Sequence, residues 1–265
     1  RFGFTESEYA RARANYLQSL ESAYNEREKT KHGSYVREYV QNFLNGEPIP
    51  GIEAEYAMMN QLAPNIPLQA MNMVMQQLVP DSNQVVIIAG PAKESLKEEV
   101  INLLKGMKDL DLQAYVDKVS DEPLMKEAPK GGKIISEKEG DIYGSTKLVL
   151  SNGVTVYVKK TDFKADEIRM KGTSLGGKSI FPDKAVMDNV IAVGGLGNFS
   201  QVDLTKVLAG KKVSVNAGLG ATTENVFGTC SPKDFETMMQ LTYLTFTAPR
   251  KDAEAFESFK NRMKA

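Results

Sequence analysis

Residues 117 to 147, DKVSDEPLMKEAPKGGKIISEKEGDIYGSTK, separate two stretches of the chain that each have the pattern of a folded unit. This segment is charged, contains prolines and a Gly-Gly pair, and lacks the apolar periodicity of a packed element. It therefore predicts a linker. Directly after it, residues 148 to 160 read LVLSNGVTVYVKK, and their alternation around Asn152-Gly153 predicts a β-hairpin that opens a second unit.

This segment divides the chain into residues 1–116, a linker at 117–146 and residues 147–265. We expect an α+β fold of two partial α/β-roll units, in which a mixed, largely antiparallel sheet is packed with helices. The chain begins at Arg1 without an initiating Met and stops at Ala265 within a helical pattern. These ends predict an internal piece of a longer protein.

The composition narrows the class of protein. With 265 residues, 42% of them hydrophobic and 25% charged, the chain is that of a globular protein with enough material for two cores. The 33 basic and 34 acidic residues nearly cancel, and no basic block is interleaved with aromatics, which argues against a nucleic-acid partner. No apolar run approaches the roughly 18 to 20 residues of a membrane span, and no signal peptide precedes Phe2.

The chain offers few residues for metal or nucleophilic chemistry. Cys230 is the only cysteine and His32 the only histidine, and about two hundred positions separate them. Zinc sites in enzymes draw several ligands from His, Cys and carboxylates, so the chain predicts no internal zinc site and no Ser/His/Asp or Cys/His triad beyond one using His32. We expect Cys230 to be a buried strand residue and His32 to lie in a solvated turn between helices.

Residues 1–116 are predicted to be mostly helical. Thr5 and Glu8 have the spacing of a capping box, which predicts a helix start. Further helices are expected at 35–44, 52–63, 67–79 and 96–104, with a short apolar strand at 84–89. The methionines 58, 59, 71, 73 and 75 are interpreted as core fillers. The buried stripe of the first helix is expected to comprise Tyr9, Ala12, Tyr16, Leu20 and Ala23.

The second unit is predicted to begin with the hairpin and to continue with alternating strands and helices. Ser231, followed by Pro232, is expected to cap a strong helix that Pro249 ends. The other expected elements are strands near 166–171, 212–216 and 225–230, and helices near 184–193 and 203–208.

Residues Gly172–Ser179, GTSLGGKS, match the Walker A pattern, in which Lys178 would contact the outer phosphates and Ser179 a magnesium ion. The context argues against a P-loop, because the preceding strand is half charged and Pro182 falls where the required helix should form. We interpret the motif as a structural glycine loop. A second cluster, Gly194–Phe199, is interpreted as a helix stop followed by a turn, since it ends a helix instead of starting one.

These residues together resemble a known family. The run Gly3–Glu8, the run Asn45–Gly51 and the run Asn83–Ile88 resemble the later part of the second domain of pitrilysin-type (insulinase family, M16) zinc peptidases. After the linker, Leu150–Val154, Gly194–Ser200 and Ser231–Asp234 look like the start of the third domain of two-repeat bacterial members. The resemblance covers nearly the whole chain, and it implies that the linker joins two homologous halves.

Members of this family bind zinc through an inverted H-x-x-E-H motif in the first domain, with a distant Glu as third ligand and the motif Glu as general base. The resemblance implies that this domain lies upstream of the chain. In the second half, the corresponding helix near Lys184–Val193 reads KAVMDNVIAV and contains neither His nor Glu. No catalytic, cofactor-binding or metal-binding residue is therefore assigned to this chain.

The resemblance implies a zinc-dependent metalloendopeptidase that hydrolyses peptides in a clamshell chamber. This chain would be inactive alone, bind no zinc, and supply chamber wall and hinge. Its partners would be a peptide or unfolded polypeptide substrate and the missing parts of its own chain, and its compartment the periplasm, with the cytoplasm as the alternative. Two other readings stay open: a non-catalytic M16-like scaffold or binding protein, and a P-loop nucleotide binder through Gly172–Ser179.

Overall fold

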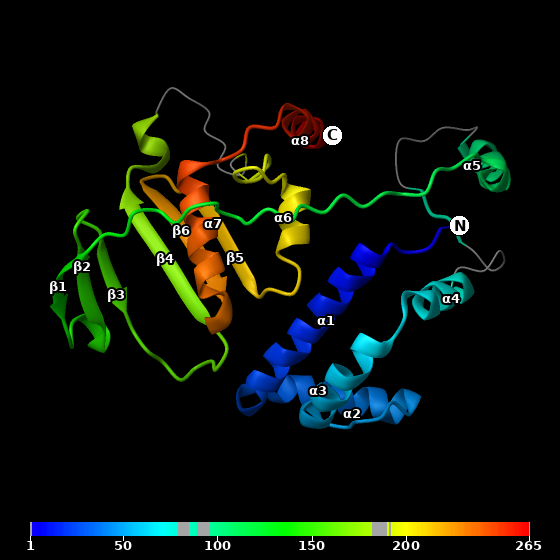
Figure 1. Ribbon diagram of the computed structural model, residues 1–265, viewed down its shortest axis with the longest axis horizontal. Helices are drawn as coiled ribbons and strands as arrows, with labels where there is room; N and C mark the ends of the chain where they lie inside the picture. Colours follow the sequence, from blue (N-terminus) through cyan, green and yellow to red (C-terminus); the bar gives the residue numbers. More distant parts are fainter. Residues whose placement is uncertain (1, 79–84, 89–95, 182–189, 191, 265) are drawn as a thin grey trace.

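The computed structural model of the chain describes residues 2–78, 85–88, 96–181, 190 and 192–264. N-terminal helices lie on one side of the molecule, and two small sheets with their helices lie on the other (Figure 1). A long extended segment leaves α5 (Leu96–Gly106), passes near the start of α1 (Glu6–Asn25) and crosses the second unit before it reaches the first strand (Figure 1).

The N-terminal helices pack mainly through α1. The Thr5 and Glu8 capping box forms as predicted, with both of its hydrogen bonds present. Tyr24 of α1 stacks on Tyr56 of α3 with ring centroids 4.6 Å apart. The remaining helices of this part are α2 (His32–Asn45), α3 (Ile52–Leu62) and α4 (Leu68–Leu78), close to the predicted ranges.

The predicted apolar stripe of α1 is mostly not buried. Leu20 is buried, but Ala12, Tyr16 and Ala23 are exposed. The interpretation was wrong because the described neighbours of α1 lie on other sides of the helix: α3 packs near Tyr24, and the second unit lies against a polar face. Helical periodicity shows that a helix has an apolar side but does not show what covers that side.

The short strand predicted at 84–89 is also not formed where the structure describes it. Val85–Ile88 have no strand assignment and are exposed, while residues 84 and 89 lie outside the described residues. A strand needs a neighbour to satisfy its backbone donors and acceptors. The strands that the described residues contain pair only with one another, in two sheets, so Val85–Ile88 have no such neighbour among them.

Part of the predicted linker forms a strand. Ile134–Lys138 form β1, which pairs antiparallel with β2 (Thr146–Leu150), and β2 pairs antiparallel with β3 (Thr155–Val158). The predicted hairpin is confirmed, and Gly153 adopts φ 85° in its turn while its N–H donates to the Leu150 carbonyl at 2.9 Å. The strand β1 escaped prediction because all five of its residues are exposed, which leaves no apolar alternation.

A second antiparallel sheet forms the centre of the second unit. Its strand order is β4 (Ile168–Leu175), β6 (Thr223–Cys230) and β5 (Val213–Leu219). Helix α7 (Phe235–Thr247) packs on β5 and β6. Among the described residues of this unit, the buried apolar side chains are Phe199, Leu204, Val226, Cys230, Met238, Leu241, Leu244 and Phe259.

The start of α7 differs in detail from the prediction. The chain first makes a short 3-10 turn at Pro232–Asp234, and the Ser231 hydroxyl does not accept a backbone N–H. It donates instead to the Asp234 carboxylate at 2.7 Å, and the same oxygen accepts the Lys212 backbone N–H at 2.8 Å. Asp234 therefore ties the start of the helix to the start of β5, a role that the local sequence does not reveal.

Two shorter helices complete the second unit. They are α6 (Gln201–Val207), which the sequence placed two residues later, and α8 (Ala253–Lys264). The mixture of helices with two antiparallel sheets confirms the predicted α+β class. Within the part of the chain that the structure describes, none of the helices has the length and apolar content that crossing a bilayer requires.

Candidate hinge site at Asp117

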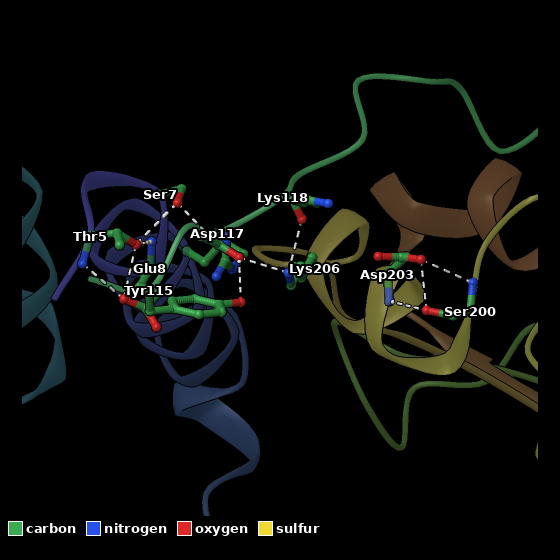
Figure 2. Close-up of polar contacts among 10 residues, drawn as sticks. Thr5, Ser7, Glu8, Tyr115, Asp117, Lys118, Ser200, Asp203 and Lys206 are labelled. Atoms are coloured by element: carbon green, nitrogen blue, oxygen red, sulfur yellow. Dashed lines mark hydrogen bonds and ion pairs between the residues drawn. The ribbon is translucent and has the colours of Figure 1, made fainter. Parts of the chain in front are cut away.

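The carboxylate of Asp117 joins the two parts of the molecule (Figure 2). Ser7 of α1 donates to its Oδ2 at 2.6 Å, and Arg11 Nη1 of α1 lies 2.6 Å from the same oxygen. From the second unit, Lys206 Nζ of α6 donates to Oδ1 at 2.6 Å. The Tyr115 hydroxyl adds a bond at 3.2 Å, and the Asp117 side chain is only 1% exposed.

Two capping boxes hold the helices that meet at this site. At the start of α1, the Thr5 hydroxyl accepts the Glu8 backbone N–H, and the Glu8 carboxylate accepts the Thr5 N–H at 2.8 Å. At the start of α6, Ser200 and Asp203 make the same reciprocal pair (Figure 2). Because a cap fixes the first turn of a helix, the cap at Thr5 holds Ser7 in place, and the cap at Ser200 fixes the start of the helix that carries Lys206.

The surroundings of Asp117 stabilise its charge. The hydrogen bond from Lys206 is the main cause that lowers the pKa of the Asp117 carboxyl far below its ordinary value, and Ser7, Arg11 and Tyr115 act in the same direction against the effect of burial. Reciprocally, Asp117 raises the pKa of Lys206. A carboxylate that accepts from this many donors is a poor proton acceptor, so Asp117 serves as a structural tie and not as a base.

The segment after Asp117 lies bound on the second unit. Lys206 Nζ also donates to the Lys118 carbonyl at 2.9 Å, and Asn198 Nδ2 donates to the Glu122 carboxylate at 3.1 Å. Leu124 packs against the core cluster that contains Leu204. The N-terminal third of the predicted linker is therefore fixed to the second unit instead of hanging free.

Helix α1 contacts the second unit along its length through polar groups. Asn15 Oδ1 accepts the Gly210 N–H at 2.7 Å, in the middle of the helix. Near the C-terminal end, Lys212 Nζ donates to Ser22 Oγ at 2.7 Å, and Glu26 Oε1 accepts the Asp166 N–H at 2.7 Å. Two ion pairs, Glu21 with Lys233 and Glu26 with Lys164, complete this surface, which we call the α1 seam.

The sequence did not reveal the α1 seam. Its members on α1 and at the C-cap of that helix are Ser7, Arg11, Asn15, Glu21, Ser22 and Glu26. Ser7, Arg11, Asn15, Ser22 and Glu26 follow one another at spacings of four or seven residues, which puts them on one helical face, and Glu21 lies next to Ser22. A polar stripe of this kind also occurs on an ordinary solvated face, so the available signal was weak.

The Walker-like motif forms a structural loop. The N–H groups of Gly176, Lys178 and Ser179 donate to the carbonyls of Thr222, Gly220 and Ala221, at 2.8 to 3.0 Å. These are the amides that a P-loop would offer to phosphate oxygens. The strand before the motif is antiparallel to its neighbour, and the described residues that follow, up to 181, form a 3-10 turn at Gly177–Ile180. This geometry disfavours the nucleotide-binding alternative.

The second glycine cluster packs against the connection between α7 and α8. The Gly197 N–H donates to the Ala248 carbonyl at 2.8 Å, and the Arg250 N–H donates to the Gly195 carbonyl at 3.0 Å. A Cβ at Gly194 would lie 2.0 Å from the Arg250 carbonyl oxygen, and one at Gly195 would lie 2.2 Å from that of Phe199. These glycines are needed for close backbone approach, which agrees with a turn.

The described residues do not fit a zinc ion. His32 is exposed at the first position of α2, not in the turn before the helix, whereas Cys230 is fully buried at the end of β6 and its pKa is raised by burial. No group of three or more His, Cys, Asp or Glu side chains in the described part of the chain is placed to hold a metal. The helix predicted near Lys184–Val193 falls mostly outside the described residues.

Comparisons with known proteins identify the relatives of this chain. No family model matches it. A PQQL-like zinc protease of Arabidopsis thaliana is 30% identical over 253 residues, which cover 92% of this chain and 24% of the relative. The chain therefore spans about a quarter of the length of that relative.

Two solved structures are similar in fold. The periplasmic protease PqqL from Escherichia coli matches with a TM-score of 0.50 and 20% identity, over 98% of this chain and 30% of that one. The ferredoxin protease FusC, in complex with Arabidopsis ferredoxin, matches with a TM-score of 0.46 and 14% identity, over 92% and 28% of the two chains. The comparisons support an M16-type zinc-protease fragment as the family assignment of this chain, which matches only part of the length of each relative.

Proposed function

We propose that this chain is part of a zinc-dependent metalloendopeptidase, in which it is non-catalytic and supplies chamber wall and hinge. One observation carries the proposal: a single zinc protease aligns with 92% of the chain, so the N-terminal helices, the linker and the second unit occur together and in the same order in that relative. The described residues contain no group of three or more His, Cys, Asp or Glu side chains placed to hold a metal.

The hinge role rests on the junction at Asp117. We propose the divisions 1–116, 117–146 and 147–265, with the first belonging to the catalytic half and the last to the closing half. The contacts of the α1 seam are polar, and polar interfaces within one chain commonly permit relative movement of the parts they join. A clamshell that admits a peptide and then encloses it needs such a joint.

Zinc supplies Lewis-acid chemistry and activates water for attack on a peptide bond when such a protein binds it. We place its ligands outside this chain. Within this chain, the residues act by position: Asp117 and the α1 seam hold the N-terminal helices against the second unit. The substrate we propose is a peptide or unfolded polypeptide, and the proposed compartment is the periplasm, which the periplasmic E. coli PqqL supports.

The proposal is tested with the full-length protein that contains these residues. Cleavage of a quenched fluorescent peptide should be lost on chelation and restored by zinc. The 265-residue chain, purified alone, should neither cleave the peptide nor retain stoichiometric zinc by elemental analysis. A full-length protein that binds no zinc and cleaves no peptide would instead indicate a scaffold or binding protein of the same family.

A matched pair of variants separates a hinge role from general damage. Asp117→Asn removes a charge that joins the two parts, whereas Asp141→Asn removes a charge in the turn between β1 and β2, away from the α1 seam. We expect Asp117→Asn to change peptide turnover at unchanged zinc content, and Asp141→Asn to leave turnover as it is. Equal turnover in both variants would overturn the hinge role while leaving the protease assignment intact.

A further inference from the structure

The central sheet of the second unit has one packed face and one open face. Helix α7 covers the packed face (Figure 1), where a Cβ at Gly228 would lie 2.7 Å from Met238 Sδ. Along β4, Arg169, Lys171 and Thr173 are exposed, whereas the residues between them are partly buried. Because successive side chains of a strand point to opposite faces, these three lie on the face turned away from α7.

The strand register gives the composition of this second face. Each row across the sheet takes one residue from β4, one from β6 and one from β5. The rows are Arg169, Thr229 and Ser214; Lys171, Phe227 and Asn216; and Thr173, Asn225 and Gly218. We call these residues the open face. They include cations, an aromatic ring, hydroxyls and amides, and none of them is acidic.

Lys171 carries an uncompensated charge in the middle row of the open face. Its Nζ lies 5.7 Å from the centroid of the Phe227 ring, and none of the ion pairs among the described residues includes it. The Phe227 side chain is 48% exposed. A positive charge and an accessible apolar surface therefore lie side by side.

The other charges near the open face are partly neutralised. Arg169 Nε donates to Glu167 Oε1 at 2.7 Å, but the Arg169 side chain is 76% exposed, and a guanidinium has further N–H donors for a second carboxylate. Glu224 of β6 alternates with Phe227 and belongs to the other face, where it accepts from Ser174 Oγ at 3.2 Å. The open face therefore keeps a net positive charge.

These groups fit an acidic polypeptide in an extended conformation. Arg169 and Lys171 are two positions apart on one strand, so their Cα atoms lie about 6 to 7 Å apart. Acidic residues at alternate positions of an extended peptide have the same spacing, because the rise per residue is the same. The hydroxyls and amides of the open face can donate hydrogen bonds to further carboxylate or carbonyl oxygens.

Single-stranded nucleic acid is less favoured as the occupant. It also stacks on aromatic rings and contacts cations, but its backbone carries a phosphate at every nucleotide. The open face offers only Arg169 and Lys171, and the 33 basic and 34 acidic residues of the chain nearly cancel. This small set of cations matches a pair of carboxylates better than a continuous row of phosphates.

We propose that the open face binds acidic, extended segments of a polypeptide, with Lys171 and Arg169 contacting carboxylates and Phe227 packing against an apolar side chain. Such segments would be the part of the substrate that this chamber wall holds. The inference deepens the proposed function, since it names a substrate class, and it rests on that function.

Lysine acetylation in the full-length protein tests whether the open face is accessible. The probe is a short synthetic peptide in which glutamate alternates with threonine and phenylalanine, and a zinc chelator keeps it intact. Lys147 on β2 is the matched control, because its Nζ lies 5.9 Å from the centroid of the Tyr157 ring in the other sheet. By mass spectrometry, the probe should protect Lys171 several-fold and leave Lys147 unprotected. A Lys171 that does not react without the probe would show that another part of the protein covers the open face, and would overturn the proposal.

Fluorescence anisotropy of the labelled probe measures its affinity for the same chelated, full-length protein. The glutamate probe should bind about five-fold or more tightly than the same peptide with glutamine, in line with exposed charge pairs. This difference should disappear at about 1 M salt, where the Debye length is about 3 Å. Equal affinity for the two peptides would overturn the proposal, and so would tighter binding of a single-stranded oligonucleotide of the same charge.

Charge reversal identifies the residues that bind the probe. Lys171→Glu should weaken binding of the glutamate probe about ten-fold, because it removes an attraction and adds a repulsion, and should leave the glutamine peptide unchanged. Lys171→Arg keeps the charge and should bind like wild type. Lys147→Glu changes the net charge equally and should also bind like wild type. Similar losses in both glutamate variants would mean a general charge effect and refute a site on the open face.

The acetylation experiment uses the wild-type protein, so the proposal stays testable if Lys171→Glu does not fold. Cleavage is measured separately, as zinc-dependent turnover of a quenched peptide. A protein that binds the glutamate probe through Lys171 but cleaves no peptide would contradict the proposed function alone. A protein that cleaves peptides but binds the glutamate and glutamine peptides equally would contradict only the acidic-segment proposal.

Discussion

The second unit and the N-terminal helices are stabilised in different ways. The second unit encloses an apolar core in which Met238 and Cys230 are fully buried and Leu241 is 4% exposed. Among the described residues of the N-terminal part, the buried apolar side chains are only Leu20 and Ala63. The second unit therefore has the features of an independently folding body, whereas the N-terminal helices rely on what lies against them.

The apolar residues of the N-terminal part are present but not enclosed. Phe43 on α2 is 87% exposed, and Leu44, Leu78 and Val85 are about two-thirds exposed or more. A run of exposed large apolar side chains of this kind commonly marks a surface that another protein element covers. The contrast shows that hydrophobic content alone does not make a core, since the elements must also be able to meet.

Truncation of a core residue in the second unit should cause the largest loss in the free energy of unfolding. Leu241→Ala removes a side chain packed with Phe199 and Leu204, and should lower the free energy of unfolding by about 2 to 5 kcal/mol. Leu44→Ala makes the same chemical change on exposed α2 and should cost less than about 0.5 kcal/mol. Denaturant unfolding of the chain measures both. Similar losses would mean that the two parts do not differ in the way proposed.

Glycine substitutions test the same difference between the packed second unit and the exposed N-terminal helices, because an added Cβ reports how closely the backbone is packed. Gly195→Ala places a Cβ against the Phe199 carbonyl at a residue with φ 90°, and should destabilise the second unit by about 1 to 3 kcal/mol. A Cβ at Gly33 in α2 would meet no atom within 4 Å, so Gly33→Ala should stabilise α2 by up to about 1 kcal/mol. In thermal unfolding, Gly195→Ala should lower the unfolding midpoint and Gly33→Ala should raise it.

Loss of the Asp117 charge should affect the joint more than either part. Because the pKa of Asp117 is lowered in the folded chain, its contribution is fully present above the ordinary Asp pKa of about 3.9 and is lost as pH falls toward the lowered value. Hydrogen exchange near pH 7 should show lower protection of α1 amides in Asp117→Asn, with α7 unchanged. Wild-type protein should acquire the same pattern only in strong acid.

The two helix caps test whether the N-terminal helices and the second unit unfold independently, and the expected changes in stability are smaller. Ser200→Ala and Thr5→Ala each remove a capping hydroxyl and should cost about 1 kcal/mol of local stability. Ser200→Ala should lower the unfolding midpoint of the second unit, because α6 contributes Leu204 to its core. Thr5→Ala should increase exchange only at the start of α1. A lower midpoint of the second unit in Thr5→Ala would show that the two parts unfold together.

Local signals made much of the fold predictable. The capping box at Thr5 and the hairpin turn at Gly153 each depend on residues within a few positions, and both form as expected. Apolar alternation located β6 because one of its faces is buried on Val226 and Cys230. The exposed strand β1 lacks this alternation, so its sequence is that of a linker.

The contacts that join the two parts could not be predicted in the same way. Ser7 and Asp117 are 110 positions apart, and Asn15 and Gly210 are 195 apart. A serine or asparagine on a helix surface has many possible partners, and nothing in its near sequence selects one. The family resemblance suggested a hinge in this region, but the residue that forms the tie emerged only from the folded arrangement.

The smallest change in stability of the 265-residue chain is expected from substitution of Phe43. In the 265-residue chain, Phe43→Ser should change stability by less than about 0.5 kcal/mol, because the side chain is already 87% exposed. If the proposed full-length protein covers this face of α2, the same change there should cost about 3 kcal/mol or more, as for a buried aromatic. Unfolding measurements on both proteins therefore test whether the exposed face belongs to an interface. A small cost in both would mean that α2 faces water in the whole protein, and the contrast between the two parts would then be a property of the fold itself.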